Sequence, residues 1–202
     1  MKKMKLIAFL ISATCLFPLG LYAVDTTCTG QLPPGVVYDN VVVPSGEVCV
    51  IGDPFDSTVG VQVNGNVTVF GSLVVYPGST IGGDVTGEPG YGSVSLQGSG
   101  VVVEGSVWLE GGSGGSSGFE AGTEIRRNFV YEGNANQLRA MGGLIGGTMK
   151  VEGNTGGGYI YSNNIGKQLR CKDNVAPSYY DLPLNGGDNI TGGHKTGQCT
   201  YF

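Results

Sequence analysis

Short stretches in which apolar and polar residues alternate follow one another along most of the chain, and no stretch has the apolar spacing of an amphipathic helix. One motif recurs within them: an aliphatic residue, a three-residue turn that usually contains glycine, and a second apolar residue. If the first aliphatic residue is position zero, copies begin at residues 63, 81, 103, 125, 145 and 165, with a degenerate seventh copy at residue 190. A period of about 20 residues is typical of one coil of a β-solenoid.

The motif also predicts which side chains are buried, because alternate residues of a strand point to opposite faces. Positions four and six are apolar in most copies and should line a core; position four of the last copy is His194, which should then pack inward. Position five, which includes Trp108, Val130, Lys150 and Arg170, should mostly face outward. A β-sandwich would also give closely spaced turns, but it gives no reason for this repeated pattern. The sequence therefore predicts an all-β fold, a right-handed parallel β-helix of about seven coils.

The two ends of the chain differ from the repeats. Residues 1–23 combine a basic start, an apolar run and a small final residue, which is the pattern of a cleaved secretory signal peptide. We expect one domain over residues 24–202: a cap and first coil at 24–60, regular coils at 61–173, and an extended coil and cap at 174–202. Residues 111–118, all glycine or serine, predict a flexible loop that bulges from one coil. No membrane span should remain once the signal peptide is removed.

Four cysteines follow the predicted signal peptide, and export would place them in an oxidising compartment. They permit three pairings, of which the two local ones, Cys28 with Cys49 and Cys171 with Cys199, close the shortest loops. Zinc binding is disfavoured because the chain has no CxxC motif and a single histidine. We therefore expect a β-helix whose two ends are each held by a disulfide.

These features together resemble a family of small secreted bacterial right-handed β-helix proteins of uncharacterised function. The resemblance rests on the segment from Asn40 to Cys49, on the repeated motif, and on the closing segments that contain Cys171 and Cys199. It implies the fold and export, to the periplasm, the cell surface or the medium, but no activity. The basic turn at Arg126 and Arg127 and the glycine-serine segment depart from the family pattern.

Charge is unevenly distributed along the chain. Residues 24–124 carry eleven acids and no base, whereas residues 125–202 carry eight bases and five acids. In a solenoid the position in the sequence is also the position along the axis, so one end would be acidic and the other mildly basic. This arrangement would allow end-to-end self-association. An acidic exported protein is a poor candidate for binding nucleic acid.

Two columns of equivalent residues suggest ladders along the axis. Asn134, Asn154 and Asn174 share position nine, where stacked amides would hydrogen-bond from coil to coil and satisfy turn backbone. We interpret this column as structural.

The second column, at position seven, holds Glu110, Glu132 and Glu152, with Glu88 before them. Stacked carboxylates repel one another unless they are neutralised, so they are candidate ligands for calcium, a cation that prefers oxygen. The alternative is that Lys150, Arg170 and Lys172 on the same face neutralise them through ion pairs. No other cofactor is indicated.

No nucleophile elbow, phosphate loop or zinc motif is present, so the sequence leans away from an enzyme without excluding one. The favoured interpretation is a rigid binding or structural surface for adhesion or for glycans, either an extracellular polysaccharide or a cell-surface glycan. Its candidate binding residues are Arg126, Arg127, Lys150 and Arg170. The alternative is a polysaccharide lyase, which would use calcium-binding acids and one of these bases as proton acceptor, an interpretation supported by fold analogy alone.

Overall fold

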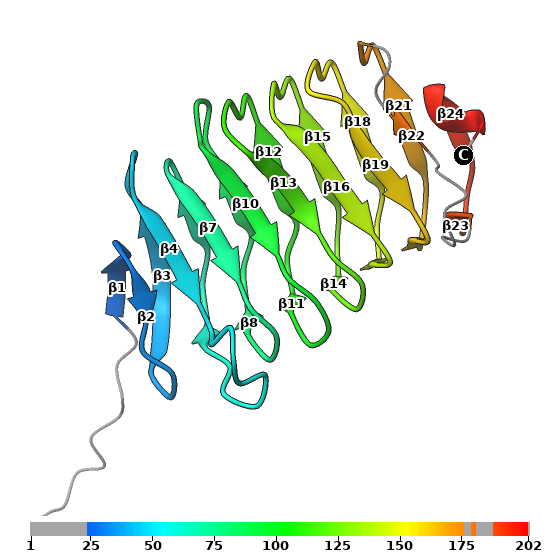
Figure 1. Cartoon of the computed structure of the whole chain (residues 1–202). Helices are drawn as coiled ribbons and strands as arrows, with labels where there is room; N and C mark the ends of the chain where they lie inside the picture. Colours follow the sequence, from blue (N-terminus) through cyan, green and yellow to red (C-terminus); the bar gives the residue numbers. More distant parts are fainter. Residues whose placement is uncertain (1–23, 176–178, 181–187, 202) are drawn as a thin grey trace, which may run out of the picture.

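A computed structural model of the chain describes residues 24–175, 179–180 and 188–201. These residues form a parallel β-solenoid of about seven turns with a period of about 21 residues (Figure 1). Strands that are neighbours in a sheet come from successive coils and pair in parallel. The predicted all-β parallel β-helix is confirmed, and the order of residues in the sequence is their order along the axis.

Each regular coil contributes three strands, which stack into three faces. Face A contains β5 (Gln62–Val63), β8 (Thr80–Ile81), β11 (Val102–Val103), β14 (Glu124–Ile125), β17 (Leu144–Ile145), β20 (Asn164–Ile165) and β23 (Ile190–Thr191). Face B contains β6 (Val67–Val69), β9 (Val85–Gly87), β12 (Val107–Glu110), β15 (Phe129–Glu132), β18 (Met149–Glu152), β21 (Leu169–Lys172) and β24 (Lys195–Gly197). Face C contains β2 (Gln31–Leu32), β4 (Val48–Ile51), β7 (Ser72–Val75), β10 (Ser93–Leu96), β13 (Ser116–Phe119), β16 (Gln137–Met141), β19 (Gly158–Tyr161) and β22 (Tyr179–Tyr180).

The N-terminal coil joins two of these faces. Strand β3 (Val37–Val43) runs from face A into face B without a turn, so the two faces form one 16-stranded sheet, while face C is a separate 8-stranded sheet. Strand β1 (Val24–Thr27) pairs with β3 at this end, and a 3-10 helix, Gln198–Tyr201, follows β24 at the other. In the part of the chain that the structure describes, no helix is long and apolar enough to cross a membrane.

The core lies where the motif predicts it. The side chains at positions zero, four and six of the six regular copies are all buried, and those of successive coils stack in register. Phe119 from face C packs edge-on against Phe129 from face B, with ring centroids 5.0 Å apart. One outward position departs from the prediction: Val130 is only 4% exposed, because Trp108 and Lys150 flank it in the strand register on the outer surface of face B.

The seventh copy is one residue out of the predicted register. Ile165 pairs with Thr191 rather than with Ile190, and Leu169 pairs with Lys195. Ile190 is therefore 67% exposed, and His194 lies exposed in the turn instead of packing inward. In this coil the polar residues Thr191 and Lys195 occupy positions zero and four, which are apolar in the regular copies. The prediction was wrong because Ile190, one residue earlier, is aliphatic and matches position zero of the motif.

The turn between faces A and B is held by side chains at position three. Asn66 Oδ1 accepts the backbone N–H of Asp84 at 2.8 Å, and Asp84 Oδ1 accepts that of Ser106 at 2.7 Å. The pattern continues from Ser106 to Asn128 and from Asn128 to Thr148. Each coil thus satisfies one turn N–H of the next coil with a side-chain oxygen, which leaves fewer buried or half-buried donors unpaired.

This contact explains why glycine is common at position two. A Cβ atom on Gly83 would lie 2.2 Å from Asn66 Oδ1, and one on Gly147 would lie 2.4 Å from Asn128 Oδ1. No real Cβ comes so close to an oxygen, and the same Cβ atoms would lie 2.7 Å from the backbone carbonyl oxygens of Gly65 and Arg127. Only glycine therefore fits at these positions without a shift of both the side chain and the backbone of the preceding coil.

Arg127 and Lys167 occupy the same position as these glycines and carry full side chains. The coils before them have Ser106 and Thr148 at position three, which are shorter than asparagine. We therefore infer that arginine and lysine fit in these two turns because the preceding coil has a small residue at position three.

Both predicted disulfides are present. Cys28 is bonded to Cys49 near the N-terminal end and Cys171 to Cys199 near the C-terminal end, with Cα atoms 5.4 and 5.1 Å apart. Each bond joins neighbouring coils, as the short loops predict.

The glycine-serine segment is not a bulging loop. Ser116 to Gly118 belong to β13, which pairs with β10 and β16, and the N–H of Gly112 is bonded to Asn134 Oδ1 at 2.7 Å. The prediction failed because composition alone conceals that these glycines stack tightly against other coils. The signal peptide prediction, and residues 176–178, 181–187 and 202 of the predicted C-terminal cap, lie outside the described residues.

Candidate binding surfaces

A buried ladder of amides runs between faces B and C. Asn154 Oδ1 accepts the backbone N–H of Asn134 at 2.8 Å and its Nδ2 at 3.2 Å, and Asn174 Oδ1 accepts the equivalent groups of Asn154 at 3.1 and 2.8 Å. Gln198 ends the ladder by accepting from Asn174 N and Nδ2. All these amide groups of the asparagines are hydrogen-bonded within the protein. The ladder therefore stabilises the turn between faces B and C and has no such group left for a ligand.

A second, shorter ladder lies between faces C and A. Asn163 Oδ1 accepts the N–H of Gly143 at 3.0 Å, and Asn189 Oδ1 accepts Asn163 N and Nδ2 at 3.1 and 2.9 Å. Sequence reasoning missed it because the misplaced register of the last copy hid the equivalence: Asn163 and Asn189 stand two places before Ile165 and its partner Thr191.

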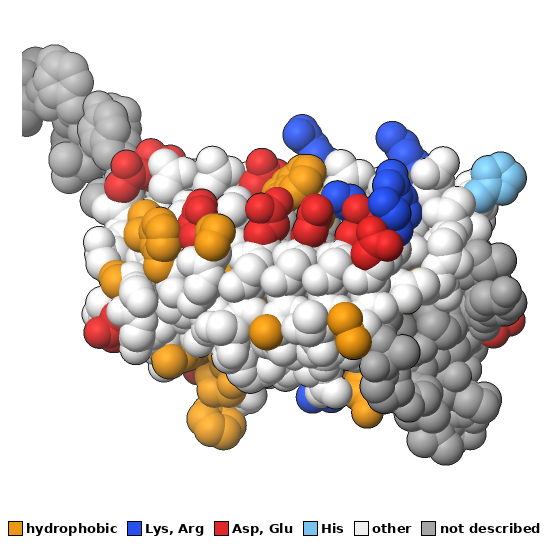
Figure 2. Space-filling view, turned by 90° about the horizontal axis from the view of Figure 1, so that it is seen from above, with side chains coloured by type: hydrophobic (Ala, Val, Ile, Leu, Met, Phe, Trp, Pro, Cys, Tyr) orange, Lys and Arg blue, Asp and Glu red, His pale blue; other side chains and the backbone are white. Residues whose placement is uncertain are grey.

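The acidic column lies on face B in the predicted register. Glu110 pairs with Glu132 and Glu132 with Glu152 in successive strands, and Figure 2 shows acidic side chains in a row with basic ones beside them. Lys150 Nζ lies 2.7 Å from Glu132 Oε2 and 3.3 Å from Glu152 Oε2. Arg170 Nε lies 2.6 Å from Glu152 Oε1 as an ion pair, without the angle of a hydrogen bond. Two of the three predicted calcium ligands are therefore neutralised by bases.

These ion pairs affect the chemistry of Lys150. The hydrogen bond to Glu132 raises the pKa of Lys150, with Glu152 adding to the effect and partial burial opposing it. A lysine with a raised pKa is less often deprotonated at neutral pH, so it is less available to accept a proton. Among the described residues, no group of three or more histidine, cysteine, aspartate and glutamate side chains could hold a metal ion. Calcium at this column stays a prediction.

The four predicted binding residues do not form one site. Lys150 and Arg170 are neighbours on face B. Arg126 follows β14 on face A and is bonded to Glu124, with Nε to Oε1 at 3.1 Å, and to Glu104. The hydrogen bond to Glu124 is the largest of the effects that raise the pKa of Arg126. Arg127 lies exposed in the turn between faces A and B.

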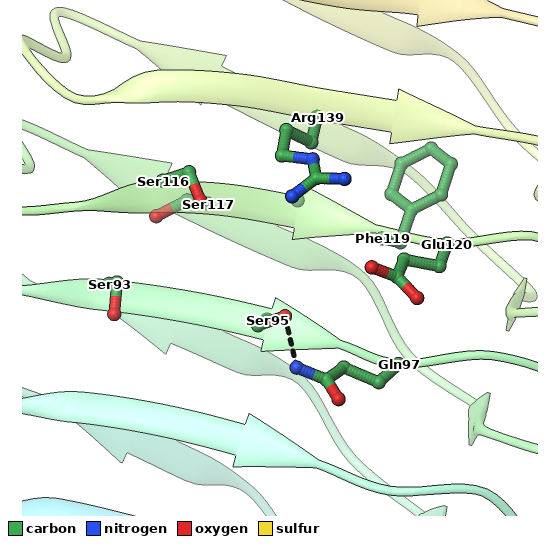
Figure 3. Close-up of a pocket in the computed structure, with 9 residues that line it drawn as sticks. Ser93, Ser95, Gln97, Ser116, Ser117, Phe119, Glu120 and Arg139 are labelled. Carbon is green, nitrogen blue, oxygen red and sulfur yellow. Dashed lines mark hydrogen bonds between the residues drawn. The ribbon is translucent and has the colours of Figure 1, made fainter.

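The surface of face C carries a polar hollow of about 240 Å³ (Figure 3). Ser93 and Ser116 lie at one end of it, and Gln97 and Glu120 lie at the other. The lining is completed by Ser95, Ser117, Gly118, Phe119 and Arg139. The side chain of Gln97 donates to Ser95 Oγ at 3.3 Å, which holds the two residues together on adjacent outward positions of the strand.

The hollow exists because one outward position has no side chain. Along face C the strand register places Val74, Ser95, Gly118, Arg139 and Tyr159 in one outward row. Gly118 has a φ of 140°, and a Cβ atom on it would lie 2.0 Å from the carbonyl oxygen of Arg139. No other residue fits there, so the backbone itself forms the floor between Ser95 and Arg139.

Arg139 extends from β16 over β13 toward this floor (Figure 3). It is exposed, and within the described part of the chain it makes no ion pair and no hydrogen bond. Sequence reasoning missed it, because the hollow depends on a glycine between two coils that are distant in the sequence. The signal that could have found it is the outward row of face C, in which Ser95, Gly118 and Arg139 follow two valines.

Comparisons of the chain with models of protein families, with curated proteins and with solved structures find no match. The resemblance to secreted bacterial β-helix proteins therefore stays a prediction from sequence motifs, and the parallel β-solenoid is what the structure adds to it.

Proposed function

We propose that this chain is an exported, non-enzymatic β-helix that binds carbohydrate through the hollow on face C. The observation that carries the proposal is the lining: the half-buried hydroxyls of Ser93, Ser95 and Ser116, one amide, one carboxylate and one guanidinium surround a concave patch on an otherwise regular sheet, while the fourth serine, Ser117, is buried. Such a set can donate to and accept from the ring hydroxyls of a sugar at the same time.

The rigidity of the solenoid supports this role. The lining residues come from β10, β13 and β16 and from the residues directly after β10 and β13, so paired strands fix most of their backbone. A site that is already ordered loses less entropy when it binds, which favours recognition of ligands as polar as sugars. Two disulfides near the ends of the coil support the proposed export.

A polysaccharide lyase is the second candidate, because the hollow contains both an acid and an arginine, Glu120 and Arg139. Two observations favour binding over cleavage. The residues that line the hollow include a single carboxylate, whereas the lyase hypothesis needs several acids that converge on a cation. Of the bases suggested as proton acceptors, Lys150 and Arg126 are held by glutamates that raise their pKa.

The test is a glycan array probed with the purified, disulfide-bonded protein and two variants. Ser95→Tyr fills the hollow, and Thr68→Tyr adds the same ring at an outward position of face B as a matched control. We expect bound glycans to be retained by the control and lost by Ser95→Tyr. An absence of any bound glycan, or equal binding by all three proteins, would overturn the proposal. Release of unsaturated sugar from a bound polysaccharide would replace it with the lyase.

A further inference from the structure

We propose that the ligand of the hollow is an acidic sugar, whose carboxylate is bound by Arg139 and whose hydroxyls contact the serines and Glu120. This inference rests on the proposed carbohydrate binding and adds the chemical class of the ligand.

Several basic side chains on the surface are already neutralised by acids. Arg126, Lys150 and Arg170 are paired with glutamates, and Lys172 with Asp173. Arg139 has no such partner among the described residues, although Glu120 lines the same hollow. An exposed guanidinium left unpaired in a chain of formal net charge −5 keeps all its donors available for an anion.

The guanidinium of Arg139 favours a carboxylate over other anions because of its shape. Its planar donors match the two oxygens of a carboxylate, and such bidentate pairs are stronger and more specific than a point-charge contact. Because Gly118 has no side chain, none occupies the space between the guanidinium and the backbone floor, so an anion that enters from solvent can bind there.

The same hollow also contains one acid, Glu120. Glu120 would repel a second negative group on the ligand, but it can accept hydrogen bonds from hydroxyls. The lining therefore favours a unit with one carboxylate at one side and hydroxyls at the other, which describes a uronic-type sugar. It disfavours a densely charged polyanion such as a multiply sulfated sugar. Tyr159, the next residue of the outward row after Arg139, offers part of a ring on which a neighbouring sugar can stack.

The experiment compares three probes by calorimetry: a uronic-acid trisaccharide, its methyl ester, and acetate. The ester keeps the sugar and masks the charge, while acetate keeps the charge and removes the sugar. We expect the free acid to bind the wild type most tightly and to bind Arg139→Gln at least tenfold more weakly. Arg139→Lys should recover part of the loss, because lysine restores the charge without the bidentate geometry. Arg127→Gln, which removes an exposed cation outside the hollow, should bind like the wild type.

The outcomes separate the two proposals. If ester and acid bind equally and Arg139→Gln has no effect, while Ser95→Tyr still abolishes binding, the acidic-sugar inference is wrong and carbohydrate binding stands. Acetate binding as tight as that of the trisaccharide would show a simple anion site and overturn the inference. If no sugar binds any variant, both proposals fail. Circular dichroism of each variant shows whether a loss of binding reflects a loss of folding.

Discussion

Replacing Asn154 by alanine should destabilise the protein far more than the same change at an exposed asparagine. The Asn154 side chain takes part in four hydrogen bonds: it accepts two from Asn134, and it donates to Tyr131 O at 3.0 Å and to Asn174 Oδ1 at 2.8 Å. Alanine would leave the buried N–H of Asn134 without this partner, which costs ~1–3 kcal/mol, and would remove three further bonds worth ~1 kcal/mol or less each. We expect a loss of about 4 kcal/mol, a large part of the ~5–15 kcal/mol that stabilises a typical domain.

Asn128 provides the matched control. Its Oδ1 also accepts a backbone N–H from the next coil, that of Thr148 at 2.9 Å, but it lies in a half-exposed turn where water can replace it. Asn128→Ala should cost about 1 kcal/mol. Urea unfolding, followed by the fluorescence of Trp108 and by circular dichroism, measures both losses. If the two variants lose the same free energy of unfolding, the buried ladder contributes no more than an ordinary turn contact, and the reasoning fails.

Three further predictions concern the core, alkaline pH and calcium. Val107→Asp puts a charge into a stacked apolar column and should prevent accumulation of folded protein, measured as soluble yield; a normal yield with an unchanged melting temperature would contradict the register. Burial raises the pKa of Tyr91, so the folded state holds that proton more tightly than the unfolded chain, and the stability present below pH ~10 should fall above it. Tyr91→Phe should reduce this loss, measured by urea unfolding at pH 9 and 11; an identical fall in both proteins would refute the assignment. Because Lys150 neutralises Glu132 and Glu152, millimolar calcium should leave the wild-type melting temperature unchanged but raise that of Lys150→Met, and a rise in the wild type would show that the ion pairs do not block the metal.

The sequence predicts the coils because burial recurs with the period of the coil. Positions four and six are apolar in nearly every turn, so their residues appear at a fixed spacing, and the asparagines at position nine share that spacing because each bonds the next. The sequence predicts the register of the last copy wrongly because its positions zero and four are polar. Thr191 and Lys195 lie at the end of the solenoid, where fewer coils cover them, and polar residues are tolerated there.

The hollow is harder to predict for a physical reason. It results from an absent side chain at Gly118 between Ser95 and Arg139, residues that are remote in the sequence and adjacent only once the coils are stacked in register. A pattern of hydrophobic positions describes what fills the interior. It contains little information about an outer surface, where the solvent accepts almost any side chain.

The turn between faces A and B imposes a rule on how such a chain can change during evolution. An asparagine or aspartate at position three leaves no room for a Cβ at position two of the next coil unless it moves, whereas serine and threonine occur before arginine and lysine. A bulky residue at Gly147 would need a smaller residue in place of Asn128, and it would also need the backbone of the preceding coil to shift, because its Cβ would lie 2.7 Å from the carbonyl oxygen of Arg127. New charged groups at this edge of the solenoid therefore require more than one change, and Arg127 and Lys167 occur where the preceding coil has the smaller Ser106 and Thr148.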